Sequence, residues 1–225
     1  MHAGKGIQRF SGITVRIKMK GKFITFEGCE GVGKSRQIRL LEEYLKNNGI
    51  KYYFTREPGG TVISEQIRAV ILDGKNAEMT DECEALLYAA ARAQLIRQEI
   101  EPRLNNGELV FCDRYVDSSL AYQGKARGLG YEFVKRINSY AFSNAMPDLT
   151  VFLNLSPKDA FLRKGGADGT DRLELSGAEF HDKVYEGYLE LAEIYRDRFA
   201  VIDASGSKEQ THAKIIAALK EKGII

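Results

Sequence analysis

The sequence predicts a single α/β domain in which helices cover a parallel β-sheet. The chain has 225 residues, of which 44% are hydrophobic, so it can bury one sizeable core, and nothing in its composition requires a second domain. Short apolar runs rich in β-branched and aromatic residues alternate with longer segments of helical period, which is the pattern of parallel strands joined by helical crossovers. A glycine-rich loop follows the first run and opens a helix.

Five apolar runs are the predicted strands. They are Phe23–Phe26, Tyr52–Thr55, Leu109–Cys112, Leu149–Leu155 and Phe199–Ile202. Between the first two, Ile38, Leu41 and Leu45 fall on one helical face, and Gly49 stands where a helix C-cap glycine belongs. This part of the chain is therefore one β-α-β unit.

Five further segments are predicted to be helical. A long helix is expected from about Asp81 to about Leu104, with Asp81 and Glu84 forming a start that resembles a capping box. The others are expected at roughly 115–123, 131–143, 176–197 and 207–221. The glycine-rich polar stretch Lys164–Thr170 predicts a mobile excursion over one end of the sheet.

The formal net charge of +2 is unevenly distributed, because residues 1–22 contain six Lys or Arg and no acid. The remaining chain is mildly acidic. Residues 1–18 are predicted to be a loose or upstream-start extension before a domain spanning 19–225. A basic arm that binds nucleic acid is the alternative.

The chain shows no predicted membrane segment and no predicted metal-binding cysteine cluster. Its apolar runs are shorter than the ~20 residues that a membrane helix needs, and its N-terminus lacks the apolar core of a signal peptide, so a cytoplasmic protein is expected. Cys29, Cys83 and Cys112 lie in unrelated contexts and are expected to be reduced. Cys29 is expected to fill space as a small neutral residue.

The glycine-rich loop is the strongest functional signal. The run Gly28-Cys29-Glu30-Gly31-Val32-Gly33-Lys34-Ser35 fits G-x-x-x-x-G-K-[ST] between a predicted strand and a predicted helix. Backbone N–H groups would then surround the phosphates of ATP, Lys34 would reach the β and γ oxygens, and Ser35 would hold Mg²⁺. A glycine-rich turn before an ordinary helix is the alternative.

The third predicted strand ends in a carboxylate followed by a guanidinium. Asp113 at this position suits the metal ion or its waters, as a second strand beside a phosphate loop commonly provides. Arg114 follows at once, and a fork-shaped permanent cation here indicates a second anionic group nearby.

Two helical stripes suggest a pocket for a nucleobase. Tyr115, Ser118, Ser119, Tyr122 and Gln123 share one helical face that is polar and aromatic, which suits a wet pocket or, alternatively, a solvated helix side.

The second stripe consists of Tyr88 and Arg92, which lie one turn apart on the long helix. A ring that stacks on a base and a guanidinium that donates to its edge would form a base reader. A core tyrosine with a surface arginine is the alternative.

These motifs together resemble the thymidylate kinase family from Met19 to the C-terminus. The motifs are 26–35 (the phosphate loop), Thr55-Arg-Glu-Pro-Gly-Gly-Thr61, Asp113-Arg-Tyr-Val-Asp-Ser-Ser-Leu-Ala-Tyr-Gln-Gly124 and Asp171-Arg-Leu-Glu174. The resemblance implies a nucleoside monophosphate kinase fold with a doubly wound five-stranded parallel sheet, a lid at about 163–175 and usually a homodimer. It also implies Mg-dependent transfer of the ATP γ-phosphoryl group to dTMP, giving dTDP and ADP for dTTP synthesis.

The resemblance also implies roles for individual residues. Glu30 would accept from the deoxyribose 3′-OH, Tyr122 would crowd C2′, and Glu57-Pro58 would form a rigid turn that is often cis. Three residues would surround the dTMP phosphate: Arg56, Arg68 and Arg114. The base would be held by Arg92 at O4, stacking on Tyr88, and contacts with Ser119 and Gln123. Asp171 and Glu174 would approach the bound dTMP as the lid closes.

Two positions depart from the family pattern. Gly31 follows Glu30 where one branch has arginine, so the chain resembles the branch whose catalytic arginine comes from the lid. Arg163, Lys164 and Arg172 are the candidates, and Arg172 is favoured. Arg36 replaces the threonine common after the loop serine, and nothing in the sequence explains it.

Three other functions are weighed against this one. Another nucleoside monophosphate kinase would share the phosphate loop, but Tyr88, Arg92 and Tyr122 argue for a deoxypyrimidine pocket. A regulatory GTPase would need an Asn-Lys-x-Asp guanine reader, which the sequence lacks. A structural protein with a vestigial loop is disfavoured because every phosphate-handling residue type is present.

Overall fold

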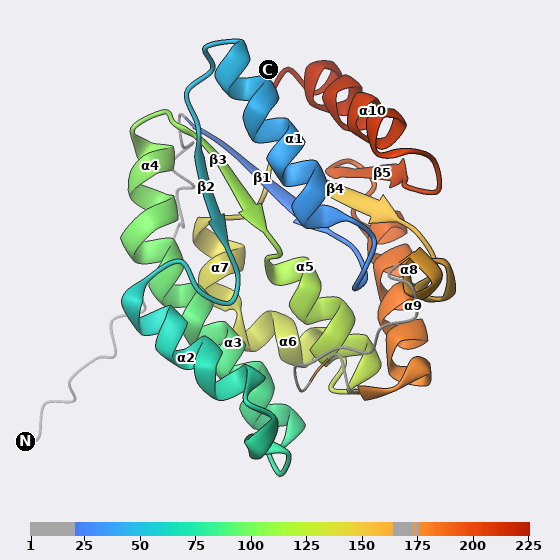
Figure 1. Cartoon of the computed structure of the whole chain (residues 1–225). Coiled ribbons are helices and arrows are strands. Elements are labelled where there is room, and N and C mark those ends of the chain that lie inside the picture. The colour runs from blue at the N-terminus through green and yellow to red at the C-terminus, as the bar shows by residue number, and fades with distance from the viewer. Residues whose placement is uncertain (1–20, 164–172, 174–175) are drawn as a thin grey trace, which may run out of the picture.

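The computed structural model describes residues 21–163, 173 and 176–225, so the predicted extension 1–18 and most of the predicted lid lie outside the described residues (Figure 1). Within that part, five parallel strands form one sheet in the order β2-β3-β1-β4-β5. The strands are β1 (Lys22–Glu27), β2 (Tyr53–Arg56), β3 (Leu109–Asp113), β4 (Leu149–Asn154) and β5 (Phe199–Asp203). The predicted doubly wound α/β fold and all five predicted strands are confirmed, within one or two residues at each end.

Strand β1 lies at the centre of the sheet and is buried on both faces. Every residue from Phe23 to Glu27 is buried, so Phe23, Ile24 and Phe26 contribute to the core from both faces and the polar Thr25 and Glu27 are buried with them. The chain first adds β2 and β3 on one side of β1 and then β4 and β5 on the other. In such sheets the ligand site lies beyond the carboxyl ends of the strands where this order reverses.

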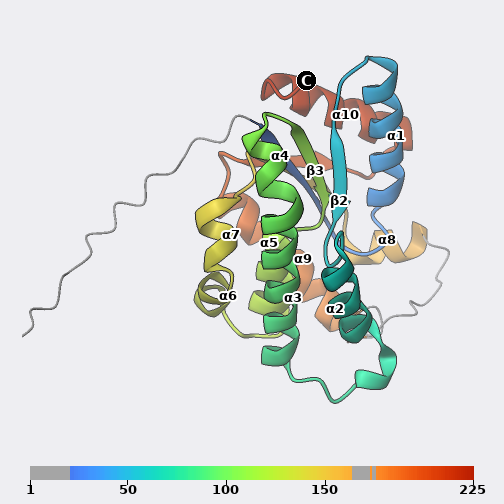
Figure 2. The same ribbon diagram turned by 90° about the vertical axis from the view of Figure 1, so that its left-hand side faces the viewer.

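Helices cover both faces of the sheet. Helices α1 and α10 lie on one face, and α3, α4, α5 and α9 lie on the other (Figures 1 and 2). The helical segments are α1 (Lys34–Asn47), α2 (Val62–Leu72), η1 (Gly74–Asn76), α3 (Asp81–Leu95), η2 (Ile96–Ile100), α4 (Glu101–Asn105), α5 (Val116–Ser119), η3 (Leu120–Ala126), α6 (Tyr131–Ile137), α7 (Ser139–Asn144), α8 (Pro157–Arg163), α9 (Ala178–Ile194) and α10 (Lys208–Glu221).

The predicted long helix begins at Asp81 as expected, but the predicted capping box of Asp81 and Glu84 is wrong. Thr80 is the N-cap, and its side chain accepts from the Cys83 N–H at 3.3 Å. Glu84 is fully buried and contacts side chains far away in the sequence instead of closing a capping box with Asp81. The helix continues to Asn105 through the π-helical segment η2.

Two other predicted helices are interrupted. The helix expected at 115–123 is a short α5 that continues as the π-helical segment η3, and at its end the Arg127 N–H donates to Tyr122 O at 2.9 Å. The helix expected at 131–143 breaks at Asn138, whose side-chain amide donates to Val134 O and accepts from Arg92. Sequence periodicity did not indicate α2 or α8.

A buried ion pair fixes α5 to the sheet. The Asp117 carboxylate is fully buried. Arg198 Nη1 donates to its Oδ2 at 2.7 Å, and Arg198 Nη2 donates to its Oδ1 at 2.6 Å. Thr150 on β4 also donates to Asp117, at 3.0 Å. Arg198 directly precedes β5, so this cluster joins α5, β4 and β5.

We expect Arg198→Ala to lower the free energy of unfolding by about 3 kcal/mol, because it leaves the Asp117 carboxylate buried and unpaired. Urea denaturation measures the change. The matched control is Arg196→Ala, since Arg196 is exposed two positions earlier. Equal stability of the two variants would contradict a structural role for the pair.

Candidate active site

The carboxyl ends of three strands meet at one edge of the sheet. Asp113 of β3 is in register with Phe26 of β1 on one side and Arg56 of β2 on the other. A pocket of about 230 Å³ opens beyond these ends. The residues that follow each strand therefore converge on one place.

The pocket brings together most of the predicted acceptor residues. Around it lie Glu30, Arg56, Glu57, Pro58, Arg68, Tyr88, Arg92, Arg114, Ser118, Ser119, Tyr122 and Gln123, together with Leu72, Asp113, Tyr115, Leu173 and His181, of which Leu72, Leu173 and His181 were not predicted. The predicted residues Asp171, Arg172 and Glu174 lie outside the described residues.

The glycine-rich loop leaves β1 and enters α1 at Lys34. Gly28 has φ 146° and lies so close to β4 that an added Cβ would meet Leu153 O at 2.9 Å, which only glycine permits. Lys34 is 9% exposed and its Nζ donates to Gly28 O at 3.4 Å. Burial, and next the Arg114 charge, lower the pKa of Lys34. The amine thus folds over the loop.

Cys29 is the neutral space-filling residue that its position predicts. It is 2% exposed, and burial raises the pKa of its thiol to about 11. The neighbouring Arg114 and Lys34 charges favour the thiolate but do not overcome burial. The thiol is therefore protonated at neutral pH.

Ser35 and Asp113 line a second hollow, next to the first pocket. Asp113 Oδ1 is buried and has no hydrogen-bond partner among the described residues. Carboxylate and hydroxyl oxygens are the donor types that Mg²⁺ prefers, so this pair of residues beside the phosphate loop fits the ion. No group of three or more His, Cys, Asp or Glu suited to a metal occurs in the part of the chain that the structure describes.

Arg114 connects the loop to the pocket. Its backbone has φ 67°, a left-handed conformation that is uncommon for a non-glycine residue and that occurs here at the turn from β3 into α5. Its Nη1 donates to Gly28 O at 3.1 Å and to the Tyr188 hydroxyl at 3.3 Å. The guanidinium lies over the Tyr122 ring, 5.2 Å from its centre. It thus lies between the phosphate loop and the pocket.

Glu27 holds this arrangement together and was not among the predicted site residues. Its carboxylate accepts from Tyr115 N–H at 2.8 Å, Ser118 Oγ at 2.6 Å and Tyr188 OH at 2.8 Å. Burial, and next the Asp117 charge, raise the pKa of Glu27 to about 7. The available sequence signal was a carboxylate ending an apolar strand directly before the glycine-rich loop.

Arg92 is buried, and its guanidinium is bound on every side. Its Nε and Nη2 donate to Glu57 Oε2 at 2.7 and 2.6 Å. Its Nη1 donates to Ser119 Oγ at 3.0 Å and to Asn138 Oδ1 at 2.6 Å, and Nη2 also donates to Tyr115 O at 3.2 Å. Its predicted donation to a base therefore requires a change in one of these bonds.

Glu57 also lines the pocket, and one of its carboxylate oxygens is unpaired among the described residues. Its Oε1 is buried without a hydrogen-bond partner among the described residues. Burial raises the pKa of Glu57 to about 7, although Arg92 favours the charged form. The Glu57–Pro58 peptide is cis, as the resemblance implied.

Arg56 and Arg68 place two further guanidinium groups at the pocket. Arg56 is about half exposed and pairs with both Glu65 oxygens at 2.9 Å. Arg68 Nη1 donates to Pro58 O at 2.9 Å. With Arg114, the pocket thus has guanidinium groups from three separate segments, which suits a phosphate dianion.

We expect the stability difference between wild type and Glu27→Gln to depend on pH. Because the folded-state pKa of Glu27 is raised to about 7 from 4.5, its contribution to stability is fully present below pH 4.5 and lost as pH rises through about 7. Glu27→Gln removes this titration, so wild type should lose stability relative to the variant across that window.

Urea denaturation between pH 4.5 and 8 tests this, with the exposed Glu221→Gln as the control. Parallel stability curves for wild type and Glu27→Gln would contradict the raised pKa.

Comparison with known proteins supports a function for this site. The family model described as thymidylate kinase matches residues 26–215. The thymidylate kinase of Geobacillus sp. (strain WCH70) is 45% identical over 206 residues, covering 91% of this chain and 98% of that protein. That of Symbiobacterium thermophilum is 49% identical over 199 residues, covering 88% and 92%. Among the described residues, no helix is long and apolar enough to cross a membrane.

Proposed function

The chain belongs to the thymidylate kinase family, and we propose that the pocket at the strand ends binds dTMP while the glycine-rich loop binds the ATP phosphates. Members of this family are nucleoside monophosphate kinases, so the chain is a phosphotransferase that moves the ATP γ-phosphoryl group to dTMP, giving dTDP and ADP. The observation that carries the site assignment is the position of Arg114, whose guanidinium contacts the loop at Gly28 and also lines the pocket.

On the donor side, we assign the ATP phosphates to the backbone N–H groups of residues 28–35 and to Lys34. The unpartnered Asp113 Oδ1 and the nearby Ser35 fit Mg²⁺, which when bound would neutralise phosphate charge. Lys34 then adds a positive charge where negative charge develops on the transferring group.

On the acceptor side, we assign the dTMP phosphate to Arg56, Arg68 and Arg114. The attacking phosphate oxygen is already ionised at neutral pH, so the reaction needs no general base. These residues would hold the acceptor phosphate in line with the γ-phosphorus and neutralise its negative charge.

At the far end of the pocket, we assign the deoxythymidine group to the residues on α3, α5 and η3. Tyr88 would stack on the thymine, Ser119 and Gln123 would complete the base pocket, and Tyr122 would crowd C2′ of the sugar. Ser118 lies beside Arg114, and Glu30 would meet the 3′-OH. Arg92, bound to Glu57 and Ser119, holds the base pocket in shape and is our proposed partner for O4.

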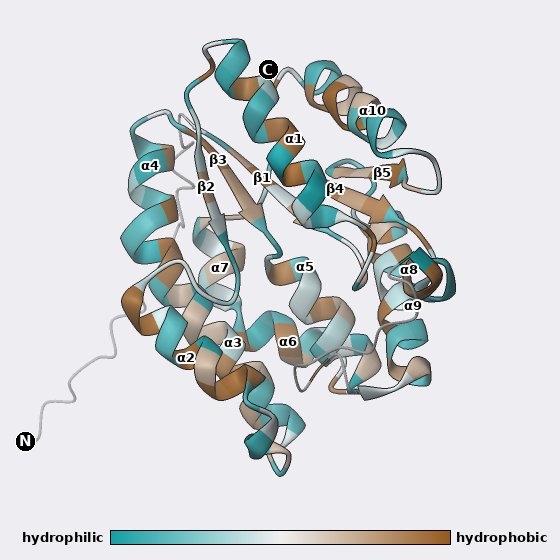
Figure 3. Ribbon diagram, viewed as in Figure 1, coloured by the Kyte–Doolittle hydropathy of each residue, from teal (hydrophilic) through white to brown (hydrophobic). Residues whose placement is uncertain are grey.

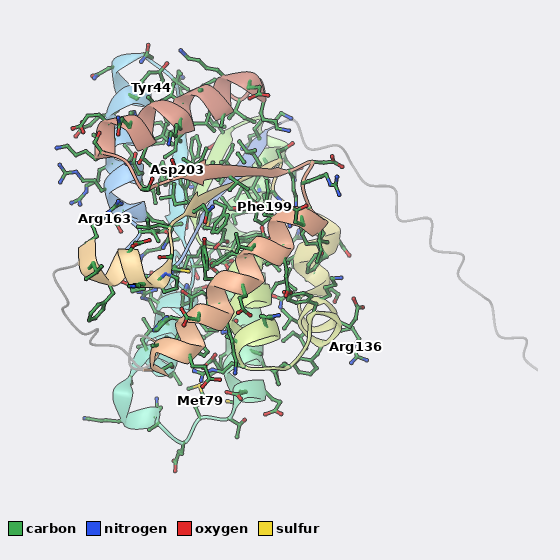
Figure 4. The ribbon with its side chains drawn as sticks, turned by 90° about the vertical axis from the view of Figure 1, so that its right-hand side faces the viewer. Tyr44, Met79, Arg136, Arg163, Phe199 and Asp203 are labelled. Atoms are coloured by element: carbon green, nitrogen blue, oxygen red, sulfur yellow. The ribbon has the colours of Figure 1, made fainter. Side chains whose placement is uncertain are left out.

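Of the three candidate lid cations, Arg163, Lys164 and Arg172, Arg163 lies among the described residues. Arg163, at the end of α8, donates to Ala204 O at 2.9 Å and to Ser205 O at 3.1 Å in the loop that follows Asp203 (Figure 4). Arg163 also lines a hollow with Gly31, Val32 and Gly33 of the phosphate loop, so it stays a candidate. Arg172 lies outside the described residues, and its role stays a prediction.

We further propose that the enzyme is a homodimer paired through α2 and α3. These helices pack together, and parts of α2 are hydrophobic (Figure 3). The exposed large apolar side chains are Val62, Ile63 and Val70 on α2 and Leu86 on α3. Burying such side chains against a second copy would remove them from water. The expected cytoplasmic location and absence of a nucleic-acid partner remain predictions.

We expect Lys34→Ala and Arg114→Ala each to lower kcat by about 10²–10³, the scale for loss of one charge partner in the transition state. ADP release with dTMP and ATP measures this. Lys51→Ala and Arg136→Ala are the matched controls, because both residues are exposed and line none of the pockets described above. Turnover unchanged by both site substitutions would refute the assignment.

We expect the double variant Ile63→Lys/Leu86→Lys to be monomeric, because two buried charges per copy would oppose pairing through α2 and α3. Sedimentation velocity compares it with wild type. The control is Val201→Lys, which places the same charge at an exposed apolar position on β5. A dimer that persists in the double variant would exclude this surface.

A further inference from the structure

Glu84 is a buried carboxylate behind the base pocket. It is fully buried on α3, and its Oε1 accepts from Gln123 Nε2 at 2.9 Å. Arg127 donates to the same carboxylate, with Nη2 at 3.2 Å from Oε2 and Nε at 3.4 Å from Oε1. The Glu84 charge is thus paired, and Gln123 is held in the same cluster.

This contact determines which end of the Gln123 amide faces the pocket. A carboxylate only accepts hydrogen bonds, so the NH₂ end of the amide must face Glu84 and the carbonyl oxygen must point away from it. Gln123 lines the pocket, and its Oε1 has no hydrogen-bond partner in the part of the chain that the structure describes. The Gln123 oxygen is therefore available to accept a hydrogen bond from a ligand in the pocket.

We propose that Glu84 is a positioning residue that makes Gln123 select a pyrimidine with a ring N–H at N3. Thymine and uracil carry that donor, whereas cytosine has a lone pair at N3 that would face the Gln123 oxygen without a proton between them. The inference rests on the proposed assignment of this pocket to the base of dTMP. It adds a contact at N3 that rejects cytosine, beside the proposed donation from Arg92 to O4.

Arg127 has a separate structural role. Its Nε lies 3.3 Å from Asp81 Oδ1, its Nη2 donates to Ser176 Oγ at 3.4 Å, and its guanidinium lies over the Phe180 ring at 4.4 Å. These contacts join α3 to α9 and do not involve Gln123. Stability and base selection can therefore be separated by substitution.

The test compares kcat/KM for dTMP, dUMP and dCMP in wild type and in Glu84→Gln. An amide at position 84 can both donate and accept, so the Gln123 amide becomes free to turn. We expect the dTMP-to-dCMP ratio to fall about tenfold or more, the scale set by one mismatched buried hydrogen bond, mainly through KM. The dTMP-to-dUMP ratio should not change, because both bases carry N3–H.

Three further variants make the test specific. Glu82→Gln changes an exposed carboxylate on the same helix and should behave as wild type. Arg127→Lys keeps the Glu84 carboxylate and a cation, so it should lower thermal stability without changing the dTMP-to-dCMP ratio. Glu84→Gln/Arg127→Gln removes the buried carboxylate together with its cation and leaves the partly exposed Asp81 without its partner, and it should show the same loss of selectivity if Glu84→Gln alone does not fold.

A dTMP-to-dCMP ratio that stays at the wild-type value in the folded Glu84 variants would overturn the inference. So would an equal loss of selectivity in Arg127→Lys, which would make the effect one of general packing. A wild-type enzyme that showed no preference for dTMP at all would instead refute the assignment of the pocket, which keeps the two failures distinct.

Discussion

The site depends on the hydrogen bonds that the buried Glu27 carboxylate accepts at the end of the central strand. A carboxylate in the interior must be surrounded by donors, and here they come from the turn after β3, from α5 and from α9. Two of these donors, Ser118 and Tyr188, also contact the Arg114 guanidinium. The position of the cation between loop and pocket thus follows from the requirement to satisfy one buried acid.

A second buried acid shapes the opposite wall of the pocket. Glu57 binds Arg92, which in turn binds Ser119 and Asn138, so one guanidinium joins the turn after β2 to α3, α5 and the start of α7. Removing either partner of such a pair is strongly destabilising, because the remaining charge stays buried. The pocket wall is consequently held together by this one guanidinium, and one of its hydrogen bonds must change before Arg92 can donate to a base.

The sequence alone was sufficient to predict the features that depend on residues close together in the chain. The five strands and the phosphate loop are readable because apolar runs and loop glycines act within a few residues. Glu27 was missed because its hydroxyl donors lie 91 and 161 positions away. Glu84 was assigned to a helix cap because the spacing allowed it, whereas the fold uses it to bind Gln123 and Arg127, 39 and 43 positions away. Similarly, Arg92 was identified from its helical spacing, but its binding to Glu57 and Asn138 depends on tertiary contacts.

The burial of Cys29 has a practical consequence for chemical labelling. Of the three cysteines, Cys29 and Cys112 are buried and only Cys83 is exposed. Electrophiles such as maleimides react with accessible thiolates, so a dye would attach on α3 and leave the nucleotide loop unmodified. Because Cys83 lies one turn from Leu86, the fluorescence of that dye would report on whether two copies of the chain meet there.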